Sequence, residues 1–458
     1  MPALFRLEEV LKATGGKLLS DSANAIIKGV SIDSRTIKRG DIFIAIRGEN
    51  FDGHDFVGRV LEKASAIVVS RKDVPVGSRC PVILVKDTVR ALGDLAAFHR
   101  RRFNIPVVAI TGSAGKTTTK EMAARVLATR FCILKNIANQ NNLIGVPLTL
   151  LRLKSRHEIA VVELGTNLPG EIRRLTQITH PTVAILTNIG ESHLEFLKSR
   201  AGVFKEKFEL VRQMAARGVV IYNQDDVFLK AIGRKPLTQR LISCGTIKTA
   251  RFYAEGIETN GNNQTHFFLN GKDPFTLRTS ARHMVDNALA AIAVGQFFKI
   301  HHAGIRKILA RFKPLDNRGS LYKVGPYKLI DDTYNSNPVS LRSAIGSIHQ
   351  LPYRGRKIFV CGDMLELGPQ TERLHREMGR RMAKADIDIL LTVGKHSRWI
   401  AEQARSNKNI SVCHCPDIPT AQNRLARYLT AGDMIFLKGS RGIHLERIVE
   451  FIKEKVNS

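Results

Sequence analysis

Short apolar runs recur along the chain and are separated by polar or amphipathic stretches. Runs rich in Val, Ile and Leu have the composition of buried strands. The alternation of such runs with helical stretches predicts an α/β protein with mostly parallel sheets, because parallel strands need crossover connections. We expect strands at 25–32, 41–46, 66–70, 81–85, 106–110, 159–164, 182–188, 218–223, 327–332, 357–362, 389–393 and 434–439, with helices at 55–64, 89–102 and 116–128.

Two changes in this pattern divide the chain into three parts. The first part is a small mixed α/β unit. The second part contains a strand, a glycine-rich turn and a helix in this order at 106–128. That order is typical of a nucleotide-binding sheet. After 313–319 the alternation of strands and helices begins again, and the polar segment 245–280 indicates a short antiparallel insertion. We therefore expect domains at 1–86, 87–313 and 314–458.

The segment TGSAGKTT (111–118) follows an apolar strand and opens a helix. Backbone N–H groups of such a loop can cradle phosphates, Lys116 can reach the terminal phosphates, and the Thr117 hydroxyl can bind Mg²⁺. Ile110 replaces the first glycine of the strict motif, yet the strand, loop and helix order still favours an ATP site. The expected nucleotide contacts in this loop are Gly112, Ser113, Ala114, Gly115, Lys116, Thr117 and Thr118.

Charged residues after other predicted strands are candidates for the metal. Glu163 ends a strand at the sheet edge where ligands bind, and a carboxylate suits Mg²⁺. For His193, spacing alone favours a hydrogen-bonding role in a loop. Lys207 lies among alternating charges that favour a solvated helix face.

The second half of the chain adds further polar candidates. Asp332 ends a strand and could bind a ribose or a cation, while Tyr334 could stack on a base. An Asn- and Pro-rich turn explains the same residues without a ligand. Arg318 could neutralise a transferred phosphate or lie on the surface. Asn287 shares one helix face with His283.

Charge is the unusual bulk property of this chain. It has 71 Lys and Arg against 41 Asp and Glu, a formal net charge of +30. Such a charge could attract nucleic acid or a membrane surface, but the basic residues are spread along the whole chain. The six cysteines form no CxxC pair, which fits a reducing compartment. No apolar stretch approaches the ~18 residues that span a bilayer.

Taken together, ten segments resemble the Mur ligase family. They occur in the family's order and cover nearly the whole chain. No Asp-Asn-Pro-Arg occurs, which argues against the family members that add diaminopimelate to a dipeptide. Ala114 replaces a common Asn or Ser, a change that a backbone contact survives. The segments are 31–56, 110–122, 139–151, 161–172, 186–197, 202–211, 282–291, 331–345, 362–368 and 437–446.

The resemblance implies a UDP-binding N-terminal domain, a central ATPase domain and a Rossmann-like C-terminal domain. By position, Thr117 and Glu163 would hold one Mg²⁺. His193 and a carbamylated Lys207 would hold a second. The resemblance further implies that Lys116 and Arg318 contact the phosphates, that Asn287, Asp332 and Tyr334 bind the adenosine, and that Ser34, Arg35, Asn50 and Phe51 meet the UDP-sugar. The implied catalytic residues are Lys116, Lys207, His193 and Arg318.

The resemblance implies an ATP-dependent ligase that adds D-alanyl-D-alanine to UDP-N-acetylmuramoyl-tripeptide through an acyl phosphate. We expect a monomer in the bacterial cytoplasm that needs no nucleic acid and is not inserted in a membrane. Two alternatives remain open at this point. One is a family ligase with a shorter muramyl peptide or a folate substrate. The other is a basic P-loop ATPase that binds nucleic acid.

Overall fold

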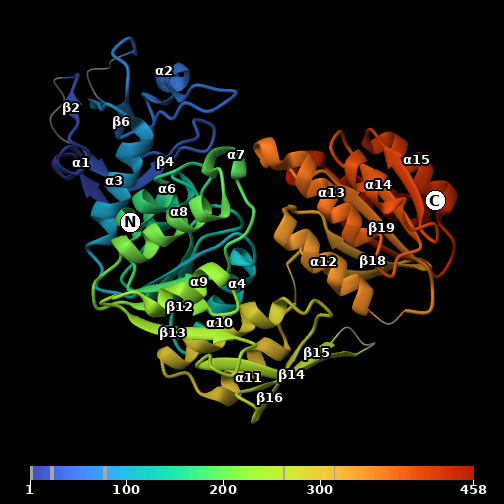
Figure 1. Cartoon of the computed structure of the whole chain (residues 1–458). Helices are drawn as coiled ribbons and strands as arrows, with labels where there is room; N and C mark the ends of the chain where they lie inside the picture. The colour runs from blue at the N-terminus through green and yellow to red at the C-terminus, as the bar shows by residue number, and fades with distance from the viewer. Residues whose placement is uncertain are drawn as a thin grey trace.

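Three sheets of mostly parallel strands organise the molecule. The computed structural model describes residues 4–20, 25–75, 80–260, 264–313, 315–351 and 353–457. Along the chain, an N-terminal unit is followed by a large central unit and a C-terminal unit (Figure 1). The predicted α/β class is confirmed. No helix of the described ranges is both long and apolar enough to cross a membrane.

The N-terminal unit is a small sheet with helices packed around it. Its strand order is β2 (Lys17–Leu18), β7 (Val82–Leu84), β6 (Ala66–Val69), β5 (Asp41–Ile44) and β4 (Gly29–Ser31), and β1 (Phe5–Arg6) pairs separately with β3 (Ile26–Ile27). All pairs in the main sheet are parallel except β2 with β7. The helices around it are α1 (Leu7–Thr14), η1 (Gly53–Phe56) and α2 (Val57–Val60). The next helix, α3 (Thr88–Arg100), packs against α1 and also against the central unit.

The helix expected at 55–64 is wrong in length. The chain instead forms the 3₁₀ turn η1 and the single turn α2. The Asp52 carboxylate caps η1 by accepting from His54 N. After α2 the chain makes only a turn, in which Lys63 N and Ala64 N both donate to Val60 O, and Ser65 N then donates to Asp41 O as the chain enters β6.

The central unit is a nine-stranded sheet. Its order is β16 (Asp273–Leu277), β15 (Gln264–Leu269), β14 (Phe252–Asn260), β13 (Arg240–Gly245), β12 (Val219–Asn223), β11 (Val183–Leu186), β8 (Val107–Thr111), β10 (Ile159–Glu163) and β9 (Ile133–Lys135). The pairs from β9 to β14 are parallel. Strands β14 to β16 pair antiparallel, which confirms the predicted insertion.

Helices cover both faces of this sheet, as alternate strand residues are buried on opposite sides. Val107 and Ala109 of β8 pack with one helix group, whereas Val108 and Ile110 pack with the other. The first group contains α3, α5 (Gly145–Leu150), α6 (Glu171–Thr179) and α8 (Arg200–Gln213), and the second contains α4 (Lys116–Leu127), α10 (Met284–Phe297) and α11 (His302–Ala310). Shorter helices are α7 (Leu194–Leu197), α9 (Val227–Lys230) and η2 (Ala231–Arg234).

The C-terminal unit contains a six-stranded sheet. Its order is β17 (Ser320–Val324), β18 (Tyr327–Asp332), β22 (Met434–Lys438), β19 (Lys357–Gly362), β20 (Ile389–Val393) and β21 (Ser411–Cys415), and only β17 with β18 is antiparallel. Its helices are α12 (Pro338–Gln350), η3 (Gly368–Gln370), α13 (Thr371–Met382), α14 (Arg398–Ala404), α15 (Ile418–Tyr428), η4 (Arg441–Ile443) and α16 (Glu446–Asn457).

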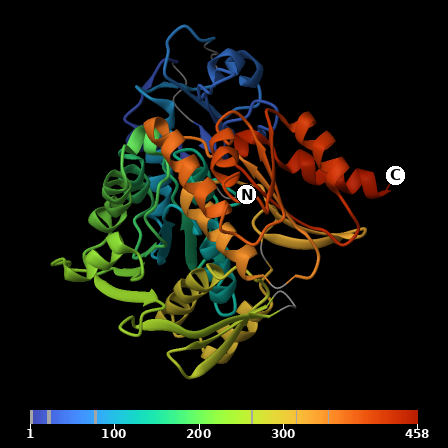
Figure 2. The ribbon, with the colours of Figure 1, turned by 45° about the vertical axis from the view of Figure 1, so that its right-hand side comes forward.

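The C-terminal unit, orange to red, lies beside the green central unit in both views (Figure 1; Figure 2). The two units touch where η3 packs against α7. The chain passes between them near Lys313. Pro314, the first residue of the expected C-terminal domain, lies outside the described residues. The carboxyl ends of the central strands therefore face a second domain, which is where parallel sheets bind ligands.

Candidate functional site

A cavity of about 810 Å³ lies between the central and C-terminal units. Its volume falls within the range of small-molecule sites. The structure brings together at this cavity the phosphate loop and most of the candidates that lie far apart in sequence. Besides Ser113 to Thr118, the lining includes Glu163, His193, Asn287, Arg318, Asp332 and Tyr334.

The phosphate loop is shaped by a glycine at the start of α4. Gly115 has φ +78°, and a Cβ at this position would lie 2.4 Å from Asn287 Oδ1. Only glycine combines this conformation with that close approach. The Lys116 ammonium donates to Gly112 O at 2.9 Å. Burial lowers the pKa of Lys116, while the nearby Glu163 carboxylate acts in the opposite direction.

Glu163 is a buried carboxylate with one unsatisfied oxygen. Its side chain is 1% exposed, and Oε1 accepts from Asn141 Nδ2 at 2.8 Å. Oε2 has no hydrogen-bond partner among the described residues. An uncompensated buried oxygen of this kind is costly, and a cation would satisfy it. Since Thr117 lines the same cavity, these oxygen donors fit Mg²⁺.

Lys207 is buried in α8 beneath the phosphate loop. The expected solvated helix face is wrong here, because Lys207 is only 1% exposed while Lys205 points to solvent. The neighbouring Glu206 carboxylate accepts hydrogen bonds from the backbone N–H groups of Gly170 and Ile172, at 2.7 and 2.8 Å. Burial, and then the charge of Lys116, holds the pKa of Lys207 well below its usual range.

The Lys207 ammonium also makes no hydrogen bond or ion pair within the described ranges. Among charges that shift its pKa, Glu163 and Lys116 both belong to the cavity wall. Lys207 is therefore a buried amine next to the phosphate loop. The local charge pattern gives no sign of this, because the three-dimensional packing of α8 against its neighbours decides which face is buried.

His193 meets the C-terminal unit. Its backbone is left-handed, with φ +51°, and its Nδ1 lies 2.6 Å from Glu366 Oε2. Glu366 is left-handed too, with φ +61°, and its carbonyl accepts from Glu195 N at 3.2 Å. The contact with His193 lowers the pKa of Glu366. Glu366 was not among the sequence candidates, because its contact with His193 joins two units of the chain.

The C-terminal side of the cavity carries stacked and paired charges. The Arg318 guanidinium carbon lies 3.7 Å from the centre of the Tyr334 ring. Asp332 pairs with the buried Lys438 at 2.6 Å. Across the cavity, Asn287 Oδ1 accepts from Thr119 Oγ1 at 3.1 Å. Lys438 was not among the sequence candidates, although it ends β22 at the ligand-binding edge of its sheet.

The four expected UDP-sugar contacts lie elsewhere. Ser34 and Arg35 are in the turn after β4, and Arg35 pairs with Asp33 at 2.8 Å. Asn50 and Phe51 precede η1, and Phe51 is 74% exposed. None of the four lines the cavity between the central and C-terminal units. The structure leaves them on N-terminal loops, separate from the phosphate loop.

Family models match all three units of the chain. Residues 26–100 match the model described as "Mur ligase family, catalytic domain", residues 110–295 match the "Mur ligase middle domain", and residues 317–441 match the "Mur ligase, glutamate ligase domain". Together these ranges cover most of the chain.

Characterised relatives are similar over nearly their whole length. The chain is 37% identical to the UDP-N-acetylmuramoyl-tripeptide–D-alanyl-D-alanine ligase of Bacillus subtilis, with 94% of each protein covered. It is 33% identical to the ligase of the same name from Escherichia coli, with 98% of each covered. These matches leave no large part of either relative unaccounted for.

Solved structures agree with the sequence matches. A crystal structure of MurF from Acinetobacter baumannii superposes with a TM-score of 0.90 at 32% identity, covering 99% of this chain and all of that one. MurF from Thermotoga maritima, solved in complex with ADP, gives a TM-score of 0.83 at 27% identity, with 94% of this chain and 98% of that chain covered. The fold and the domain arrangement are thus shared along the full length.

Proposed function

The chain belongs to the Mur ligase family, and on this premise we propose that it joins D-alanyl-D-alanine to UDP-N-acetylmuramoyl-tripeptide. The reaction converts ATP to ADP and phosphate and yields the UDP-muramyl-pentapeptide used in peptidoglycan synthesis. One observation carries the proposal. The cavity unites a phosphate loop, the buried Glu163 and Lys207 beside it, and a C-terminal domain that closes one wall.

ATP occupies the cavity with its phosphates on the loop at the start of α4. Backbone N–H groups and the helix N-terminus favour the negative charge, and Lys116 contacts the terminal phosphates. Asn287 from the central unit and Asp332 and Tyr334 from the C-terminal unit hold the adenosine. Arg318 reaches the phosphates from the C-terminal side. Nucleotide contacts from both units would keep water away from the reacting atoms.

Thr117 and Glu163 would hold one Mg²⁺, and His193 with a carbamate on Lys207 would hold the second. Mg²⁺ supplies charge neutralisation for the transferred phosphoryl group. The metal assignment is supported by the unpaired Oε2 of Glu163. His193 offers its imidazole to the cavity while Glu366 fixes its orientation, as carboxylates do for histidine ligands.

The carbamate on Lys207 is supported by the burial of its amine. Burial lowers the pKa of the amine and so favours its neutral form, and a neutral amine can attack CO₂. A new N–C bond forms and one proton is released. The product is an anion with two oxygens, which suits a hard cation better than an ammonium group does.

The ligation proceeds in two displacements. A carboxylate oxygen of the tripeptide attacks the γ-phosphorus, and the bond from that phosphorus to the ADP oxygen breaks. The amine of D-alanyl-D-alanine then attacks the acyl carbon, loses a proton and expels phosphate. Lys116 and Arg318 stabilise the negative charge that develops on the phosphoryl oxygens in both steps. Stabilising this charge is the main requirement of phosphoryl transfer.

The UDP moiety is bound by the N-terminal domain through Ser34, Arg35, Asn50 and Phe51. Three of them are exposed on loops of that domain and Ser34 is half-buried, which supports a contact with a large substrate that extends away from the ATP cavity. We place the reaction in the bacterial cytoplasm, where ATP is available. A single chain forms the whole cavity, so we expect the protein to be a monomer. We expect its domain boundaries after residues 86 and 313.

A substrate panel tests this function. UDP-muramyl-dipeptide, UDP-muramyl-tripeptide and a folate are each supplied with D-alanyl-D-alanine or with a single amino acid, and ADP release is followed. Single-stranded DNA is tested separately as a stimulator of ATP hydrolysis. We expect rapid ADP release only with the tripeptide and D-alanyl-D-alanine together. Turnover with a shorter muramyl peptide or a folate would contradict the proposed substrate. ATP hydrolysis stimulated by single-stranded DNA and not by any UDP-peptide would contradict the ligase assignment itself.

A further inference from the structure

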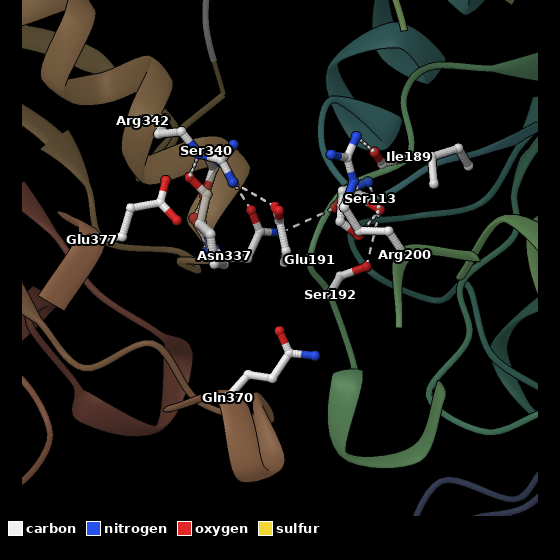
Figure 3. Close-up of polar contacts among 12 residues, drawn as sticks. Ser113, Ile189, Glu191, Ser192, Arg200, Asn337, Ser340, Arg342, Gln370 and Glu377 are labelled. Carbon is white, nitrogen blue, oxygen red and sulfur yellow. Dashed lines mark hydrogen bonds and ion pairs between the residues drawn. The ribbon is translucent and has the colours of Figure 1, made fainter. Parts of the chain in front are cut away.

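The first turn of α12 contacts the phosphate loop at Ser113, at the wall of the nucleotide cavity. Asn337 is the N-cap of this helix, and its Oδ1 accepts from Ser340 N at 2.9 Å. Its Nδ2 donates to Ser113 O at 3.2 Å, across the boundary between the two units (Figure 3). One side chain therefore caps a helix of the C-terminal domain and also holds the phosphate loop of the central domain.

A charge pair strengthens the same junction. Arg342, one turn further along α12, binds Glu191 Oε2 through its guanidinium at 2.5 Å (Figure 3). Its Nε donates to Pro338 O at 3.2 Å, which fixes the guanidinium on its own helix. The Glu191 side chain is only 12% exposed and that of Arg342 28%. Partial burial reduces solvent screening, so this pair is worth more than an exposed one.

Glu191 belongs to a loop that is bound to the phosphate loop. Ser113 N donates to Asn188 O at 3.0 Å, and Ala114 N donates to Asn188 Oδ1 at 2.9 Å. The Ser113 hydroxyl accepts from Gly190 N at 2.9 Å and donates to Gly190 O at 3.1 Å. Residues 188–192 and the phosphate loop are thus one hydrogen-bonded body, and displacement of either displaces the other.

Packing leaves little freedom at this junction. A Cβ on Gly190 would lie 1.9 Å from Cγ2 of Val339 in the first turn of α12. The residue before Gly190 is held to the central unit, because Ile189 N donates to Asp226 and Ile189 O accepts from Arg200, at 2.7 and 3.1 Å. The position of α12 is therefore set by the loop and not by a flexible surface.

We propose that Asn337, Arg342 and Glu191 form an interdomain latch that couples nucleotide occupancy of the phosphate loop to the seating of the C-terminal domain. The latch lies directly after the segment that carries Asp332 and Tyr334. Because α12 follows that segment without a linker, its seating places both side chains against the nucleotide. The three latch residues are positioning residues, and the inference rests on the proposed binding of ATP.

Coupling of this kind is reciprocal. If nucleotide binding fixes the phosphate loop and the latch, then breaking the latch must weaken nucleotide binding by the same factor. Two measurements on the full-length protein report on the latch and require no ligation reaction. They are the Kd of a non-hydrolysable ATP analogue by calorimetry, and the radius of gyration by small-angle scattering with and without that analogue.

Asn337→Ser separates the two roles of Asn337, because serine still caps a helix but cannot reach Ser113. Glu191→Gln and Arg342→Ala remove the charge pair from either side. We expect each variant to keep a melting temperature close to the wild-type value and to bind the analogue about fivefold or more weakly. Arg427→Ala, on exposed α15 away from the junction, is the matched control and should bind the analogue like the wild type.

Combined changes distinguish a latch from general damage. The double variant of Glu191→Gln with Arg342→Ala should bind no more weakly than the weaker single variant, because both remove the same contact. Arg342→Lys keeps the charge and should restore most of the affinity. In scattering, the analogue should shrink the wild type and Arg427→Ala more than it shrinks the three latch variants.

Unchanged analogue affinity in Asn337→Ser and Arg342→Ala would overturn the latch, as would independent, additive effects in the double variant. These outcomes differ from a failure of the proposed function. If the wild type bound the analogue and closed but released no ADP with the UDP-muramyl-tripeptide, the latch would stand and the substrate assignment would fall.

Discussion

Replacing Lys207 by methionine should make the protein more stable and inactive at the same time. Methionine has a similar length and no charge, so it fills the same space in α8 without an amine to desolvate. The amine that it removes is 1% exposed and has a strongly lowered pKa. Such a group is retained at a cost to folding, which is typical of a functional residue.

The size of the gain follows from the burial. Each unit by which a folded-state pKa lies below its unfolded value corresponds to about 1.4 kcal/mol of lost stability at low pH. Replacement of buried ionic groups by apolar side chains of similar volume can stabilise a protein by about 1–4 kcal/mol. We expect Lys207→Met to fall in this range. For a domain of this size, Tm should rise by roughly 2–4 °C for each kcal/mol.

The stability difference between Lys207→Met and the wild type should depend on pH in a definite direction. In the unfolded chain Lys207 titrates near 10.5, whereas in the folded chain its pKa is well below that value. Between these two values the unfolded state binds more protons, so wild-type stability falls as the pH is lowered through the window. Below the folded pKa the loss is complete and constant. Lys207→Met lacks this loss, so its advantage should grow as the pH falls from 10.5 and then level off.

The assay is denaturant unfolding across this pH range in CO₂-depleted buffer, which keeps the wild-type amine free of carbamate. ADP release is measured in parallel. Bicarbonate should raise the turnover of CO₂-depleted wild type and leave Lys207→Met inactive. In Lys207→Ala, small carboxylates should partly restore turnover by occupying the vacated space. Lys205→Met, on the exposed face of the same helix, should change stability by less than about 0.5 kcal/mol and keep its activity.

Two results would refute this reasoning. Lower stability of Lys207→Met than of the wild type at pH 7 would mean that the buried amine contributes a favourable interaction. Near wild-type turnover of the same variant would mean that the amine has no part in the reaction.

Three further changes test the cavity. Lys116→Ala should abolish ligation and leave the circular dichroism spectrum unchanged, and a variant with near wild-type turnover and nucleotide affinity would disprove the phosphate-loop assignment. Glu163→Gln keeps the oxygen that accepts from Asn141 but removes the charge. The Mg²⁺ concentration needed for half-maximal turnover should therefore rise at least tenfold, which corresponds to a loss of about 1.4 kcal/mol or more in Mg²⁺ binding free energy. An unchanged Mg²⁺ titration would argue against Glu163 as a ligand. Gly115→Ala forces φ +78° on alanine, which costs about 1–2 kcal/mol of strain, and its Cβ would clash with Asn287. Calorimetry should therefore show roughly tenfold weaker ATP binding. An affinity equal to that of the wild type would show that the loop adapts to the added Cβ.

The strands that sequence predicted best are those buried on both faces. Strands β19 and β20 have the predicted bounds of 357–362 and 389–393 and are buried throughout. Strand β18 also has its predicted bounds of 327–332, although it is only partly buried. Uninterrupted runs of Val, Ile and Leu mark such strands because helices cover both sides of a parallel sheet. Strands β1, β2, β9, β13, β17 and β21 were missed. None of them is buried throughout, and all but β13 lie at a sheet edge, so their apolar patterns are weak.

The site divides in the same way. The phosphate loop and Glu163 were visible in sequence because a local motif and a strand end define them. Lys207 was assigned only through the family resemblance, since local charge favoured the opposite face. The pairing of Asp332 with Lys438 joins residues 106 positions apart. Such contacts depend on how whole domains pack, and no local pattern encodes them.

The central claim is that an oxygen of the tripeptide carboxylate is transferred to phosphate while D-alanyl-D-alanine becomes linked by an amide bond. One measurement tests it directly. UDP-muramyl-tripeptide labelled with ¹⁸O in its reacting carboxylate is incubated with ATP, Mg²⁺ and D-alanyl-D-alanine, and both products are analysed by mass spectrometry. The account predicts UDP-muramyl-pentapeptide together with phosphate that carries one ¹⁸O atom. Unlabelled phosphate, or labelled substrate recovered intact after ATP has been consumed, would contradict it.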